Sequence, residues 1–90
     1  MKLIVYGTDL CPDCLRTHDV LREAGIEYEY RDFSAGMAPL MEFLVIRDDP
    51  AHNALFDPVR ERGGVGIPCF VIEGVEVTLD VQRVLELARL

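Results

Sequence analysis

The stretch Cys11-Pro12-Asp13-Cys14 stands between a short apolar run, Leu3-Ile4-Val5-Tyr6, and a segment with helical periodicity. The apolar run predicts a buried strand, and Gly7-Thr8-Asp9 predicts the turn that follows it. A Cys-x-x-Cys pair at the start of the helix in a βαβ unit is typical of a dithiol redox site. The unpaired N–H groups and the partial positive charge of a helix N-terminus stabilise a thiolate, which is the reactive form of cysteine.

The rest of the sequence predicts a single domain over residues 1–90 with the element order β-α-β-α-β-β-α. Gly25 is a natural end for the first helix, and Asp80 has the side chain of a helix N-cap. Residues 51–62 give the weakest pattern, and a short helix around 55–62 is the preferred interpretation. The other predicted elements are a helix at 12–24, a strand at 26–31, a helix from 37 to near 48, strands at 69–72 and 75–77, and a helix at 81–88.

The two larger predicted helices differ in how many of their faces are apolar. In the first helix we expect Leu15, Leu21 and Ala24 to share one buried face. The second helix carries apolar residues at i, i+3, i+4 and i+7 from Met37 to Leu44, and others lie outside this face. An excess of apolar residues on a helix usually means burial, so we expect deep packing. A surface that binds another protein is the alternative interpretation.

The chain is acidic, with a net charge of −7 from sixteen acidic and nine basic residues. Nucleic acids and anionic membranes are bound by basic surfaces, so neither is expected as a partner. No apolar run approaches the ~20 residues that a membrane span requires, and the first run does not resemble a signal peptide. Three cysteines, an odd number with one close pair, suit the cytoplasm better than a secreted protein built on disulfides.

The two cysteines of the motif are expected to have different roles. With Pro12 in the first helical turn, Cys11 is exposed at the helix end and Cys14 is more buried, one turn further along. Cys11 then attacks a disulfide, and Cys14 resolves the mixed disulfide by attacking Cys11. Asp13 opposes formation of the Cys11 thiolate, because a nearby negative charge disfavours a second one. Two other interpretations of the pair remain open, namely packing cysteines and half of a zinc site.

Several short stretches add to this motif. They are Val5-Tyr6, Cys11-Pro12-Asp13-Cys14, Gly66-Ile67-Pro68, Phe70-Val71-Ile72 and Gly74. Through these stretches and its element order, the chain resembles the glutaredoxin family over nearly its whole length. A dithiol near residue 11 together with x-Ile-Pro before the third strand is more specific than either motif alone. The resemblance implies an α/β, thioredoxin-like fold with a central four-stranded mixed sheet flanked by helices.

The resemblance also implies a site for glutathione or a peptide beside the dithiol. Pro68 takes the position of the family's cis-proline, and Ile67 takes the position whose backbone pairs with the bound molecule. Asp80 lies near the position that recognises the amino end of glutathione. Thr8 stands where glutaredoxins often carry a lysine that binds a glutathione carboxylate. Asp13 stands where an aromatic residue is common.

A further departure from the family pattern lies before the last helix, and the loss of the lysine also has a consequence. Thr78-Leu79 replaces the Gly-Gly pair that lets glutathione approach the backbone before the last helix. With a threonine in place of the usual lysine, an arginine is the candidate replacement for binding the carboxylate. The candidates are Arg31, Arg47, Arg60 and Arg62.

Cys69 and His18 are further candidates for the chemistry of the site. Cys69 follows the proline that the resemblance places beside the dithiol, so it is a core residue, a third redox thiol or a metal ligand. Core packing is preferred, because free cysteines are often buried as small apolar residues. His18 lies one helical turn beyond Cys14 and either tunes the resolving thiol, completes a metal site or lies on the helix surface. The surface position is preferred.

The leading hypothesis is a cytoplasmic thiol–disulfide oxidoreductase of the glutaredoxin class. Its substrates would be protein disulfides or glutathione mixed disulfides, and glutathione or a flavoprotein reductase would supply the electrons. The reaction requires no tightly bound cofactor. One alternative is a metal or iron–sulfur binding module that uses Cys11, Cys14 and Cys69, since such metals favour thiolate ligands. The other is an accessory protein that docks a partner on its apolar second helix.

Overall fold

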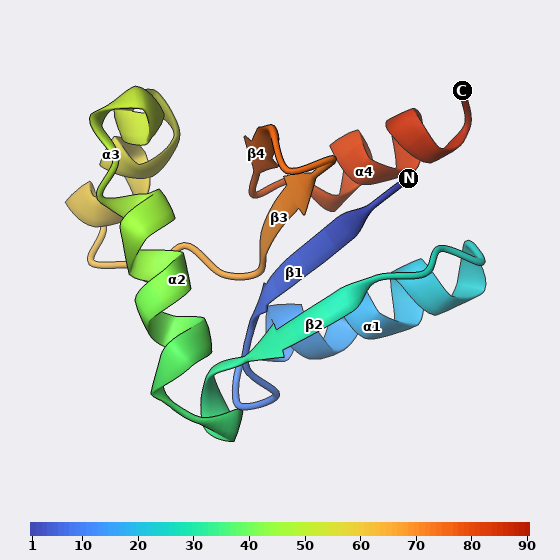
Figure 1. Ribbon diagram of the computed structural model, residues 1–90, viewed down its shortest axis with the longest axis horizontal. Coiled ribbons are helices and arrows are strands. Elements are labelled where there is room, and N and C mark those ends of the chain that lie inside the picture. Colours follow the sequence, from blue (N-terminus) through green and yellow to red (C-terminus); the bar gives the residue numbers. More distant parts are fainter.

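A four-stranded mixed sheet forms the centre of the computed structural model, which describes all of residues 1–90 (Figure 1). The strands lie in the order β2-β1-β3-β4, and they are β1 (Leu3–Gly7), β2 (Glu29–Asp32), β3 (Cys69–Ile72) and β4 (Glu76–Thr78). β1 is parallel to β2, whereas the β1–β3 and β3–β4 pairs are antiparallel. The helices are α1 (Pro12–Glu23), α2 (Met37–Arg47), α3 (Asn53–Glu61) and α4 (Val81–Ala88). The predicted α/β, thioredoxin-like fold is confirmed.

Each face of the sheet carries its own apolar core, because successive side chains of a strand point to opposite faces. The core on the α1 and α4 side contains Leu3, Val5, Leu21, Phe70, Ile72 and Val84. The core on the α2 and α3 side contains Tyr6, Phe43, Phe56, Cys69 and Val71. The helices therefore form two layers, with the sheet between them.

Helix α1 ends at a glycine cap, and this cap also shifts the start of β2 to a later residue. Gly25 has a φ of 69°, a left-handed conformation that favours glycine. The N–H groups of Gly25 and Ile26 donate to the carbonyls of Arg22 and Leu21, which are the two bonds of a Schellman cap. Because Ile26 takes part in this cap, β2 begins at Glu29 and not at residue 26 as predicted.

The buried face of α1 also differs from the prediction. It consists of Cys14, Thr17 and Leu21, whereas Leu15 is 48% exposed and Ala24 is exposed. This face is defined by a cysteine and a threonine, so counting large apolar residues alone misplaces it. As a result α1 turns the second cysteine of the motif toward the sheet.

The predicted deep burial of α2 is wrong. Only Pro39 and Phe43 are buried on this helix, while Met41 is 60% exposed and Val45 is 74% exposed. The helix ends at Arg47, shortly before the proline that was expected to stop it. No helix of the structure, α2 included, has both the length and the apolar character needed to cross a membrane.

Helix α3 adds a fourth helix to the predicted element order, where the sequence indicated only a short helix around 55–62. It begins at Asn53, directly after a 3-10 turn at Pro50–His52, and contains Pro58 in its interior. Proline removes a backbone donor and disfavours a helix at such a position. Burial of Phe56 in the core on this face of the sheet, and of Val59 against the loop before β3, holds the helix together despite this proline.

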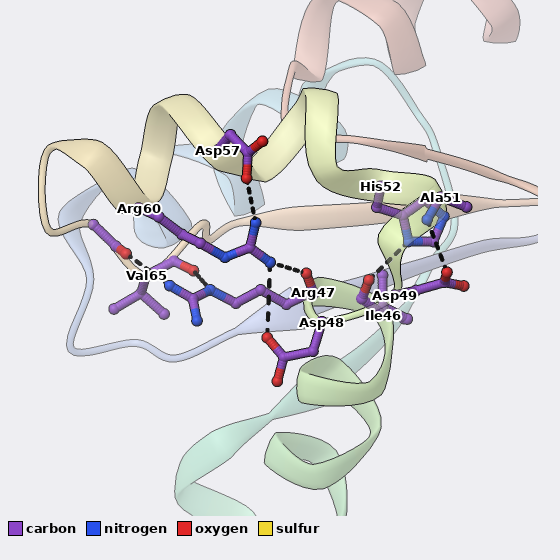
Figure 2. A network of polar contacts seen from close by, with 10 residues as sticks. Ile46, Arg47, Asp48, Asp49, Ala51, His52, Asp57, Arg60 and Val65 are labelled. Carbon is purple, nitrogen blue, oxygen red and sulfur yellow. Dashed lines mark hydrogen bonds and ion pairs between the residues drawn. The ribbon is translucent and has the colours of Figure 1, made fainter.

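Arginine side chains tie α3 to the end of α2 (Figure 2). The guanidinium of Arg60 donates to the Arg47 carbonyl and, at 2.9 Å, to Asp57, and it lies 3.7 Å from Asp48. Arg47 in turn donates to the Val65 carbonyl at 3.0 Å. The loop that leads to β3 is thus held against the α2–α3 junction by bonds to its backbone.

Candidate active site

Most of the predicted site residues lie in or next to two loops that leave the central strands β1 and β3 at the same end of the sheet. Tyr6, near the end of β1, pairs with Cys69 at the start of β3 in an antiparallel register. The loop after β1 leads to Cys11, and the loop before β3 contains Ile67 and Pro68. The register therefore brings together segments that are more than half the chain apart in sequence.

Cys11 is the N-cap of α1 and is partly exposed. Its backbone is extended, and Pro12 occupies the first turn of the helix as predicted. The side chain of Cys11 makes no capping hydrogen bond, so the N–H groups of the first turn remain free to stabilise a thiolate. Asp13 forms an ion pair with Arg16, which offsets the negative charge next to the thiol.

Cys14 lies one turn further along α1 and is buried, with an exposed fraction of 1%. Burial, followed by the neighbouring Cys11 thiol and the charge of Asp9, raises the pKa of the Cys14 thiol to about 12. A backbone hydrogen bond from Thr8 acts in the opposite direction. The pair therefore combines a partly exposed thiol at the helix end with a buried thiol that retains its proton, and both are free thiols in this structure.

A cavity of about 530 Å³ extends from the first turns of α1 to the loop before β3. Asp13, Ile67, Pro68 and Asp80, which the sequence assigned to substrate binding, line it together. The Ile67–Pro68 bond is cis, as the resemblance implied. Asp80 is the N-cap of α4, as predicted, and accepts a hydrogen bond from the N–H of Gln82 at 2.9 Å. Residues from both ends of the chain thus form one concave surface that reaches the Cys-x-x-Cys turn at Asp13.

Thr8 does not line this cavity, and its hydroxyl accepts a hydrogen bond from the N–H of Leu10 at 3.3 Å. The positive charge of the cavity comes instead from Arg16 and Arg62. Arg62 donates to the Pro58 carbonyl at 3.3 Å and forms no ion pair. The other candidate arginines are held elsewhere by carboxylates or backbone carbonyls, namely Arg31, Arg47 and Arg60.

Comparison with known proteins agrees with this geometry. The family model described as Glutaredoxin matches residues 3–77, a range that includes the Cys-x-x-Cys turn and Pro68. The chain belongs to the glutaredoxin family. Glutaredoxins are thiol–disulfide oxidoreductases that generally use glutathione as their reductant.

One relative of this glutaredoxin is a protein of Haemophilus influenzae that is named "Uncharacterized protein". It is 27% identical over 82 residues, which cover 91% of this chain and 92% of the relative. No solved structure matches the chain. The family match ends before Asp80, which lies at the wall of the cavity.

Cys69 of this glutaredoxin is buried on the sheet face opposite to α1, and therefore opposite to Cys14. It packs in the core with Phe43 and Phe56, and burial raises the pKa of its thiol to about 12. No three His, Cys, Asp or Glu side chains gather where they could hold a metal ion. Cys69 thus does not join Cys11 and Cys14 in a ligand set, and the preferred interpretation of core packing is confirmed.

A hydrogen-bonded network at the α1–β2 contact is the part of this site that the sequence did not reveal. The hydroxyl of Tyr30 donates to Asp9 at 3.0 Å, and Nε2 of His18 lies 3.2 Å from the same carboxylate oxygen. The His18 ring stands edge-on to the Tyr30 ring, with centroids 4.4 Å apart, and its Nδ1 contacts the hydroxyl of Tyr28. With an exposed fraction of 18%, the His18 side chain does not lie freely on the helix surface as expected. The four-residue spacing from Cys14 is the one signal that points to it.

Proposed function

We propose that this glutaredoxin is a dithiol oxidoreductase that reduces protein disulfides or glutathione mixed disulfides in the cytoplasm. The observation that carries the proposal is the pairing of a partly exposed Cys11 at the N-terminus of α1 with a buried Cys14 one turn further. An exposed thiol at a helix N-terminus can reach an incoming disulfide. A buried thiol reacts only with a sulfur that is already attached to its neighbour. Membership of the glutaredoxin family supports the same reaction.

The reaction begins when the Cys11 thiolate attacks the glutathione sulfur of a mixed disulfide. A bond forms between Cys11 and glutathione, the original S–S bond breaks, and the substrate sulfur leaves as a thiolate that takes a proton from solvent. Cys14 then attacks Cys11, which forms the intramolecular disulfide and releases glutathione. Two further glutathione molecules reduce this disulfide and are themselves oxidised to one glutathione disulfide. A second glutathione can also replace Cys14 and attack the mixed disulfide directly.

The charges of the cavity fit glutathione, a short peptide with two carboxylates and one ammonium group. Arg62, which has no acidic partner, supplies positive charge in place of the lysine that Thr8 replaces, whereas Arg16 shares its charge with Asp13. Asp80 and Ile67 both line the cavity. In the proposal Asp80 supplies a carboxylate for the ammonium group, and the backbone of Ile67 pairs with the peptide. The proposed binding residues therefore come from α1, the loop before β3 and the start of α4.

Turnover of a glutathionylated substrate with glutathione, glutathione reductase and NADPH tests the proposal. Wild type is expected to turn over, Cys11→Ser to be inactive, and Cys14→Ser to retain activity because glutathione can perform the second step. Arg62→Ala should raise the KM for the substrate about tenfold with little change in kcat, since a charge-assisted hydrogen bond is lost. Arg22→Ala, at an exposed arginine of α1 outside the cavity, is the matched control.

Each result has a distinct meaning. If wild type is active only with a flavoprotein reductase such as thioredoxin reductase, the electron donor is not glutathione. Activity with neither donor system would contradict the proposed oxidoreductase. An equal KM for Arg62→Ala and Arg22→Ala would remove Arg62 from the binding site while leaving the dithiol chemistry in place.

A further inference from the structure

We propose that Tyr30 and Asp9, held in place by His18, form a path that carries the proton of the Cys14 thiol to solvent when Cys14 attacks the mixed disulfide on Cys11. This inference rests on the proposed function, because it concerns the second step of that reaction. It assigns a role to a polar network that the dithiol motif does not contain.

The second step requires the Cys14 thiol to lose a proton inside the protein. Cys14 is 1% exposed, so bulk water does not reach its sulfur freely. Burial also holds the pKa of this thiol at about 12, far above neutral pH. An attack on Cys11 therefore needs a nearby group that accepts the proton as the new S–S bond forms.

The hydroxyl of Tyr30 lies close enough to Cys14 to accept this proton. A Cβ atom added to Gly7 would lie 2.6 Å from the Cys14 sulfur and 3.5 Å from the hydroxyl oxygen of Tyr30. The Cys14 sulfur and the Tyr30 oxygen are therefore at most about 6 Å apart. One bridging water spans this distance, and a small shift would bring the two atoms into direct contact. A phenol hydroxyl both donates and accepts, so Tyr30 can take a proton from Cys14 while giving its own to Asp9.

Asp9 connects this hydroxyl to solvent. Its carboxylate accepts the Tyr30 hydrogen bond at 3.0 Å, and its side chain is 62% exposed. Nε2 of His18 lies 3.2 Å from the same carboxylate oxygen, and the His18 ring packs edge-on against Tyr30. His18 thus acts as a positioning residue that holds the carboxylate over the phenol, and Asp9 exchanges its proton with water.

The groups that face Cys14 come from three elements. They are Cys11 on α1, Asp9 in the loop after β1, and Tyr30 on β2, whose own pKa is raised by burial and by its hydrogen bond to Asp9. In the proposed step the electron pair of the Cys14 S–H bond forms the bond to Cys11. The bond between Cys11 and glutathione breaks, and glutathione leaves with that electron pair. The proton of Cys14 passes through Tyr30 to Asp9 and then to water.

A single-turnover experiment separates this step from the first one. Reduced protein with Cys69→Ala is mixed with excess dithiobis(nitrobenzoate), an aromatic disulfide whose thiolate product is coloured. The first product release reports the attack by Cys11, and the second reports the attack by Cys14. Cys14→Ser should show the first phase only. This assay does not depend on glutathione binding.

Tyr30→Phe and Asp9→Asn are expected to slow the second phase tenfold or more, with the first phase changed less than about twofold. The second phase of wild type should be nearly flat between about pH 6 and 8, because the path removes the proton during the attack and no prior ionisation of the thiol is needed. Without the path it should rise about tenfold per pH unit, since only thiolate formed by direct ionisation then reacts. Tyr6→Phe, which removes a tyrosine hydroxyl on the opposite sheet face, is the matched control.

The sign of the Asp9→Asn effect decides between the path and a simple charge effect. The charge of Asp9 disfavours the Cys14 thiolate, so if charge were its only influence, Asp9→Asn would speed the second phase. A faster second phase, or a pH profile of Tyr30→Phe that matches wild type, would overturn the proposal. A wild type with no second phase would instead contradict the dithiol function itself. Asp9 is exposed, so its variant tests the path even if Tyr30→Phe impairs folding.

Discussion

Gly7 and Cys14 touch across the end of β1, so closely that a Cβ atom on Gly7 would stand 2.6 Å from the Cys14 sulfur. Real Cβ atoms essentially never approach another heavy atom to this distance. Gly7 does not adopt a positive φ, so it is lack of space and not backbone conformation that requires glycine here. The last residue of β1 therefore determines where the buried thiol of the dithiol lies.

Gly7→Ala is expected to destabilise the protein by about 1–3 kcal/mol, the usual cost of overpacking, and to slow the attack by Cys14 on Cys11. Denaturant unfolding and the two-phase single-turnover assay measure these effects. In a Cys14→Ala background the same substitution should cost less than about 0.5 kcal/mol, because the remaining contact with Cβ of residue 14, at 3.5 Å, is an ordinary one. Equal costs in both backgrounds would show that the methyl group does not act through the sulfur.

Cys69 is expected to contribute to stability and not to catalysis. Cys69→Ser should lower the free energy of unfolding by about 1–3 kcal/mol, because it places a hydroxyl among buried apolar groups. Cys69→Ala should fold and retain wild-type turnover of a glutathionylated substrate. Denaturation and steady-state kinetics of the two variants check this. A folded Cys69→Ala protein without turnover would return Cys69 to the redox chemistry.

Features that depend on neighbouring residues could be predicted from the sequence. Pro12 in the first turn of α1, Gly25 at its end and Asp80 as the cap of α4 all follow from local backbone chemistry. The cis bond at Pro68 could not be predicted in this way, because only about 5–6% of X–Pro bonds in folded proteins are cis. It was implied by the family resemblance alone.

Features that depend on tertiary packing could not be predicted from local patterns. The apolar residues of α2 do not indicate how many of its faces meet a neighbour, and Pro58 argues against a helix that the burial of Phe56 maintains. The hydrogen bond between Tyr30 and Asp9 joins residues 21 positions apart. Only the parallel pairing of β1 and β2 brings these two side chains together.

The exposed face of α2 predicts opposite results for two substitutions on the same helix. Val45→Glu should change the free energy of unfolding by less than about 0.5 kcal/mol, because Val45 is 74% exposed. Phe43→Ala should cost about 3–5 kcal/mol, because the ring is fully buried between Tyr6 and Phe56. Urea denaturation of both variants measures the difference. A large loss in Val45→Glu would mean that this face of α2 is covered in solution.

Glu42 should make stability depend on pH in the acid range. The guanidinium of Arg31 and, to a smaller extent, the hydroxyl of Tyr6 hold the pKa of Glu42 below its usual 4.5. A carboxylate whose pKa is lowered by folding stabilises the folded state above its unfolded pKa and loses that contribution as the pH falls through the folded value. The stability of wild type over Glu42→Gln is therefore expected to be present near neutral pH and to shrink below about pH 4.5.

Urea denaturation of wild type and Glu42→Gln from neutral pH to about pH 3 measures how the difference in their free energies of unfolding changes with pH. Glu23→Gln is the matched control, because Glu23 is an exposed glutamate at the end of α1, away from Arg31 and Tyr6. Arg31 contacts Glu42 through two nitrogens, so the effect should also disappear in an Arg31→Ala background. If the difference in free energy of unfolding between wild type and Glu42→Gln stays constant down to about pH 3, the Arg31–Glu42 pair does not lower the pKa of this carboxyl.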